Sequence, residues 1–165
     1  MRPQLLVGLA VLLVACGSPA TSVPASPSLS APAAVTTPSP LPSSQPASIS
    51  VASSRYGKII VDSSGRTLYL FDAERTTEPK CYGPCAAAWP PLSTTTAPVS
   101  GSDLSQALIA TAPRSDGSLQ VTYNGHPLYY YVGDRAPGEI KCQAVFEYGG
   151  GWYVLDAQGN KISAP

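Results

Sequence analysis

The sequence predicts a mainly β protein: one small pseudo-symmetric domain built from two hairpin repeats, with one or two short helices. Three observations lead to this prediction. All nine Tyr, both Trp and both Phe lie within residues 55–165, so any sizeable core must form there. In the same segment, runs rich in β-branched and aromatic residues alternate with turn signals. One hairpin pattern also occurs twice, at a constant offset along the chain.

The N-terminus predicts export. Met1-Arg2 supplies a positive start, and the apolar run that follows is shorter than the roughly 20 residues of a membrane-spanning helix. Such a run is typical of a secretory signal peptide, here residues 1–15, rather than of a buried core helix. It ends in Leu13-Val14-Ala15-Cys16, which resembles the lipobox of bacterial lipoproteins. The resemblance implies that the Cys16 thiol carries a diacylglycerol whose acyl chains, such as palmitate, anchor the protein in the membrane. The alternative is ordinary secretion with a free Cys16.

Residues 16–54 begin with this cysteine and continue as a linker rich in Ser, Pro and Ala, without a charged residue. No apolar periodicity is present, so we expect the segment to stay disordered. It would tether the β domain, residues 55–165, to the membrane. The formal net charge of the chain is zero, which argues against nucleic acid as a partner.

The elements of the β domain follow in order. Residues 58–71 (KIIVDSSGRTLYLF) predict a first hairpin around a Ser-Gly turn, and 84–89 (PCAAAW) predict a helical turn that the next prolines stop. Residues 102–109 (SDLSQALI) predict a helix of about two turns with Ser102 as its cap, because two leucines lie four residues apart. A second hairpin is predicted at 119–132, around Asn-Gly, and a third at 152–163, around Gln-Gly.

The first two hairpins are copies of one unit. Six positions of the first copy match six positions of the second at an offset of sixty residues. They are Val61, Gly65, Leu68, Tyr69, Phe71 and Glu74 in the first, and Val121, Gly125, Leu128, Tyr129, Tyr131 and Asp134 in the second. The domain therefore divides into repeat one, 56–92, and repeat two, 119–162.

Alternation along each repeated strand predicts what its side chains face. Tyr69 and Phe71 point to one side and the neighbouring leucines to the other, so both faces are apolar and the strand should be central. The acid that ends each run, Glu74 or Asp134, would lie at the strand exit. There it could accept hydrogen bonds from turn N–H groups or from a tyrosine hydroxyl of the other copy.

The doubled Tyr-x-(Phe/Trp/Tyr)-x-x-Asp pattern, with CYGPCAAAWPPL after the first copy and VTYNGHPLYYY opening the second, resembles a bacterial family. It is the family of predicted lipoproteins with a Yx(FWY)xxD motif, a secreted repeat of unknown function. The resemblance implies an exported, mostly lipid-anchored protein and brings no activity with it. Two departures stand out: Glu74 replaces the Asp of the motif, and Cys142 stands where the family has a small residue such as Gly.

Three thiols remain if Cys16 is lipidated, and an odd number leaves one over in an oxidising compartment. Loop-closure entropy favours the long bridge Cys81–Cys142, at about 4 kcal/mol, over the short bridge Cys81–Cys85, at about 2 kcal/mol. The resemblance implies the short bridge instead, because these two cysteines belong to the family motif. Cys142 would then be an unpaired thiol that either joins two molecules in a dimer or stays buried.

No motif of an enzyme is present, so we expect a protein without catalytic residues, cofactor or bound metal. A Zn or Cu site from Cys81, Cys85 and His126 is a minor alternative. Trp89 and Trp152 are candidates for an aromatic ligand cleft, against the alternative that they are plain core.

The favoured function is a lipoprotein on the extracytoplasmic face of the cell membrane, with a binding or structural role in the cell envelope and an envelope component as its ligand. The alternative is a redox or metal-handling module that uses Cys81, Cys85 and Cys142.

Overall fold

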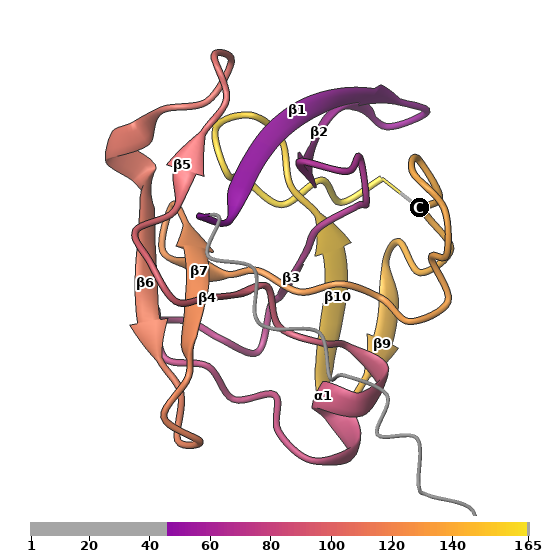
Figure 1. Ribbon diagram of the computed structural model, residues 1–165. Coiled ribbons are helices and arrows are strands. Elements are labelled where there is room, and N and C mark those ends of the chain that lie inside the picture. Colours follow the sequence, from indigo (N-terminus) through magenta and orange to yellow (C-terminus); the bar gives the residue numbers. More distant parts are fainter. Residues whose placement is uncertain (1–45, 165) are drawn as a thin grey trace, which may run out of the picture. The chain divides into compact units, whose positions relative to one another are not determined.

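The computed structural model describes residues 46–164 (Figure 1). The predicted signal peptide, Cys16 and most of the linker lie outside the described residues. In chain order the elements are β1 (Ser48–Ser54), β2 (Gly57–Asp62), β3 (Tyr69–Phe71), α1 (Pro84–Ala88), β4 (Ser93–Thr94), β5 (Val99–Ser100), the 3-10 helix η1 (Gln106–Leu108), β6 (Ile109–Pro113), β7 (Leu119–Tyr123), β8 (His126–Pro127), β9 (Val145–Glu147) and β10 (Gly150–Val154).

The strands form three small sheets, so the prediction of a mainly β protein is confirmed. One sheet has the order β2-β1-β5, a second has β3-β10-β9, and a third has β4-β7-β6 with β8 paired to β7. In the view of Figure 1 the third sheet lies on the left, the second on the right, and β1 and β2 cross the top. All strand pairs are antiparallel except β1 with β5.

The domain begins earlier than position 55, so that boundary of the predicted linker is wrong. Strand β1 occupies Ser48–Ser54 and pairs with β2 over six positions, from Ile49 opposite Asp62 to Ser54 opposite Gly57. Its four serines and one alanine match the composition of the linker, and only Ile49 and Val51 indicate alternation. The pairing with β2 buries Ile49 completely and supplies the stabilisation that the composition lacks.

All three predicted turns are present, but the second arms of the hairpins are short. In the first, only Val61 and Thr67 form a bridge across the turn, and in the second β8 is two residues long. After the first turn and after the second turn, the chain leaves its own hairpin and crosses to the other repeat. Tyr69 and Tyr129 exchange two backbone hydrogen bonds of 2.9 Å, so the two copies meet at the same position of each.

One of the two predicted helices is wrong. Pro84–Ala88 forms α1 as expected, whereas 102–109 contains only the 3-10 turn Gln106–Leu108 and Ser102 caps nothing. Ile109 already belongs to β6, where it pairs with Tyr123. The Gln106 carboxamide instead accepts a hydrogen bond from the backbone N–H of Ser100. The requirement of the sheet therefore overrides a weak helical pattern.

Two apolar clusters form the core, one on each face of the repeated strands. Tyr69, Phe71 and Tyr129 belong to the first cluster, with both tryptophans and all three cysteines of the described residues. Leu68, Leu70 and Leu128 belong to the second. The alternation predicted from the sequence is therefore present. The prediction of central strands is wrong, because β3 ends the order β3-β10-β9 and β8 is a short strand paired to β7.

Candidate functional site

The signature residues Tyr69, Glu74, Tyr129 and Asp134 bind each other across the two repeats. The Tyr69 hydroxyl donates to Oδ2 of Asp134, and the Tyr129 hydroxyl donates to Oε1 of Glu74, each at 2.6 Å. Each acid also accepts a backbone N–H from its own repeat, at 2.7 Å from Lys80 to Glu74 and at 3.0 Å from Lys141 to Asp134. The motif is therefore a reciprocal clamp between the copies.

These four residues are buried, and both tyrosines keep their protons. Burial raises the pKa of Glu74 and of Asp134, although hydrogen bonds from tyrosine and backbone donors oppose the rise. Burial and the neighbouring carboxylates raise the pKa of Tyr69 and Tyr129 far above the usual range, so both hydroxyls remain donors. No signature side chain presents a free reactive group to solvent, and the clamp is structural.

The tryptophans do not form a ligand cleft, so that prediction is wrong. The rings of Trp89 and Trp152 stack with centroids 4.0 Å apart and planes 7° apart, and both residues are fully buried. Both indole N–H groups donate to Glu147, one to Oε2 and one to the backbone oxygen. Phe71 stacks on Trp152 and Tyr131 lies against Trp89, so aromatic rings occupy the space that a ligand would need.

The cysteines follow the pairing that the family resemblance implies. Cys81 and Cys85 form a disulfide bond, and Cys142 is a buried free thiol. Burial raises the pKa of Cys142 and keeps it protonated. A disulfide between two copies through Cys142 stays a prediction, and it requires that the surrounding chain opens.

A metal site at these cysteines is not formed by the residues that the structure describes. Within 46–164, no group of three or more His, Cys, Asp or Glu side chains lies close enough to hold an ion. His126, the third ligand of that alternative, lies in β8, and burial lowers its pKa. In the same range, no helix combines the length and the apolarity that a bilayer crossing requires.

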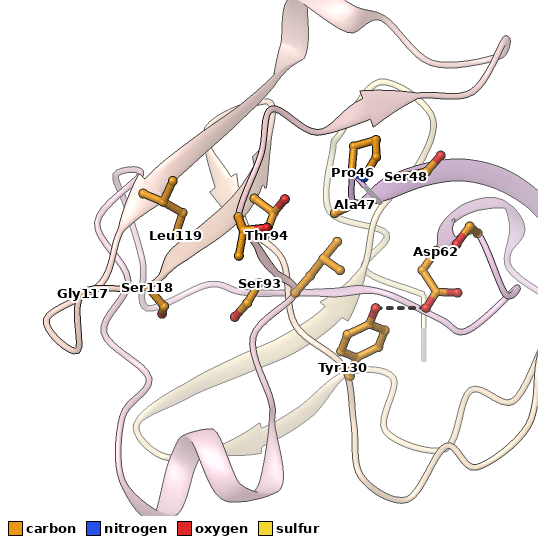
Figure 2. A pocket seen from close by; sticks show the side chains of 13 residues that line it. Pro46, Ala47, Ser48, Asp62, Ser93, Thr94, Gly117, Ser118, Leu119 and Tyr130 are labelled. Atoms are coloured by element: carbon orange, nitrogen blue, oxygen red, sulfur yellow. Dashed lines mark hydrogen bonds between the residues drawn. The ribbon is translucent and has the colours of Figure 1, made fainter. Parts of the chain in front are cut away.

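The described residues form a groove of about 790 Å³ (Figure 2). This Asp62 groove lies between the start of β1, the end of β2, strand β4 and the turn before β7. Its walls carry hydroxyls and a few apolar groups, with one charged residue. It is lined by Pro46, Ala47, Ser48, Asp62, Ser63, Leu92, Ser93, Thr94, Thr95, Gly117, Ser118, Leu119 and Tyr130.

Asp62 is fixed in place by four hydrogen bonds. Its Oδ1 atom accepts from the N–H and hydroxyl of Ser64 and from the N–H of Arg66, at 2.7–2.9 Å. Its Oδ2 atom accepts a 2.9 Å bond from the Tyr130 hydroxyl, drawn as the dashed line in Figure 2. Burial alone would raise the pKa of Asp62, but these donors together hold it below the usual value. The carboxylate is thus ionised and rigid, and 9% of the residue is exposed, at the wall of the groove.

Two residues of the groove lining, Asp62 and Tyr130, lie at positions where the repeats differ. At the offset of sixty, Asp62 matches Thr122 and Tyr130 matches Leu70, and both counterparts are buried. The Asp–Tyr pair therefore has no equivalent on the other side of the pseudo-symmetric domain. The positions that the copies share hold the fold, whereas these two departures line a surface.

A comparison with family models defines the class of this protein. The model described as a secreted repeat of unknown function matches residues 50–93 and 110–156, one segment for each repeat and together more than half of the chain. The chain belongs to this family. No curated protein and no solved structure matches it.

Proposed function

We propose that the protein is a lipoprotein of the cell envelope, anchored through Cys16, whose domain binds an envelope component in the Asp62 groove. The groove is the observation that carries the proposal. Its volume lies within the range of about 300–1,000 Å³ that is usual for ligand sites. The secreted family and the lipobox-like sequence before Cys16 support the location.

Binding suits the groove better than catalysis does. Asp62 is the only ionisable acid of its lining, and its hydrogen bonds keep it ionised at neutral pH, so it cannot act there as a proton donor. The Tyr130 hydroxyl donates a hydrogen bond to Asp62, so its hydrogen is already engaged. A fixed carboxylate among hydroxyls can accept hydrogen bonds from a ligand without reacting.

The anchor has a direct test. The Cys16→Ser variant cannot accept a thioether-linked diacylglycerol, so the protein should move from the membrane pellet to the medium, because no other membrane anchor is proposed. Cell fractionation with immunoblotting measures this, and mass spectrometry of the native N-terminus should find the lipid. A Cys16→Ser protein that stays fully in the pellet would contradict the anchor.

The groove is tested by filling it. In Ser93→Trp an indole enters the groove from β4, an outer strand whose Ser93 side chain is exposed, so the fold should tolerate it. The assay uses the insoluble envelope fraction of the producing cell after detergent extraction of the membrane, so the lipid anchor at Cys16 does not contribute to sedimentation. We expect co-sedimentation with this envelope fraction to fall at least tenfold.

The matched control is Thr111→Trp, which adds the same side chain at an exposed position of β6, the other outer strand of that sheet. It lies outside the groove lining and should bind as the unmodified protein does. Equal binding by both variants would remove the groove from the account.

A further inference from the structure

We propose that the ligand of the Asp62 groove is an uncharged polysaccharide strand. This inference rests on the proposed function and adds the chemical class of the ligand.

The first argument is charge. The lining contains Asp62 and no Lys, Arg or His. The guanidinium of Arg66 stacks on the Tyr130 ring at 4.2 Å, and Arg66 does not belong to the groove lining. Arg66 partly offsets the charge of Asp62, and the groove stays close to neutral. A polymer with phosphate or carboxylate groups would meet a fixed carboxylate and no cationic partner, which disfavours it.

The second argument is the hydrogen-bonding capacity of the walls. Hydroxyl groups are donors and acceptors at once and can rotate to suit a partner, as the hydroxyls of a sugar also can. The groove concentrates such groups from four segments of the chain. They belong to Ser48, Ser63, Ser93, Thr94, Thr95 and Ser118. The Thr94 and Ser118 hydroxyls already donate to Thr96 and Asp116, so these two can only accept from a ligand.

The third argument is the geometry of the acid. Three of the four bonds to Asp62 go to Oδ1, which leaves acceptor capacity on Oδ2 beside the Tyr130 hydroxyl. A carboxylate that the protein holds rigidly can take hydroxyl donors from a ligand without paying for its own ordering, and such bonds are stronger than neutral ones. Leu92 and Leu119 add apolar surface for the C–H faces of a sugar ring.

An extended peptide fits the same walls less well. A peptide would add to the open edge of β4, but that strand spans only Ser93–Thr94 and offers few backbone partners. Hydroxyl-rich walls therefore favour a sugar polymer.

The experiment is a competition with the native full chain. Its co-sedimentation with the envelope fraction is measured against three competitors from the same envelope: neutral polysaccharide, anionic polysaccharide retained on an anion exchanger, and the protein and lipid fractions. We expect the neutral polysaccharide to compete at a concentration at least tenfold below that of any other fraction. Stronger competition by another fraction overturns the inference and leaves the proposed function standing. Absence of envelope binding without any competitor overturns the proposed function itself.

A pair of variants then tests the role of Asp62. Asp62→Asn should weaken binding of the neutral polysaccharide roughly 10- to 100-fold, because the charged acceptor is lost. Asp156→Asn is the matched control: Asp156 accepts the same two turn N–H bonds, from Gln158 and Asn160, and lies outside the groove. If the two variants bind equally well, Asp62 does not contact the polysaccharide.

Discussion

Trp152→Ala is expected to lower the free energy of unfolding by about 3–5 kcal/mol, which is the usual cost of removing a buried indole. Trp152 is fully buried and stacks on Phe71 at 4.3 Å and on Trp89 at 4.0 Å, with the edge of Tyr129 at 5.3 Å. A cavity at this place would remove the partner of three rings at once. Domains have only about 5–15 kcal/mol of stability, so this loss is a large fraction of the total.

Urea denaturation followed by far-UV circular dichroism measures the effect. The control is Phe146→Ala on the adjacent strand β9, where the ring is 76% exposed and its loss should change stability by less than about 0.5 kcal/mol. A Trp152→Ala protein as stable as the control would contradict the stacked core.

Tyr129→Phe is expected to lower the free energy of unfolding by about 1.5–3 kcal/mol, the usual contribution of a hydrogen bond to a charged group. The ring stays, and only the donor to Glu74 is removed. Glu74 is 2% exposed, so water cannot replace the donor. Tyr148→Phe, at an exposed tyrosine, is the control and should have almost no effect.

The same prediction has a stricter form as a double-mutant cycle. In Glu74→Gln the acceptor loses its charge, so adding Tyr129→Phe should then cost less than it does in the unmodified protein. Additive effects of the two changes would show that the clamp bond between Tyr129 and Glu74 contributes nothing to stability.

The pairing of the two copies and the faces of their strands could be predicted from the internal repeat. The offset of sixty residues placed Tyr69 and Tyr129 at equivalent strand positions, and alternation then assigned the faces of both strands. The same equivalence led to the bonds of Glu74 and Asp134 with tyrosine hydroxyls of the other copy.

The errors arose where tertiary partners decide the structure. Strand β1 has linker composition, and its pairing with β2 cannot be read from its own residues. The helix predicted at 102–109 does not form, because Ile109 pairs with Tyr123 as part of β6. Trp89 and Trp152 appeared as a cleft because their sequence positions do not reveal that the two rings stack on each other.

The candidate site was missed because its residues come from distant segments. Asp62 ends β2, Tyr130 follows β8, and Ser93 belongs to β4, so spacing within one segment cannot bring them together. The differences between the copies were the available signal. Asp62 and Tyr130 are two of several positions at which the copies differ.

The central claim is that the signature residues stabilise the fold and the Asp62 groove binds the ligand. The most direct test measures envelope co-sedimentation of Tyr129→Phe and Ser93→Trp side by side, at a temperature at which circular dichroism shows both to be folded. The account predicts that Tyr129→Phe binds as the unmodified protein does and that Ser93→Trp loses binding. Lost binding in a folded Tyr129→Phe protein, together with retained binding in Ser93→Trp, would contradict it.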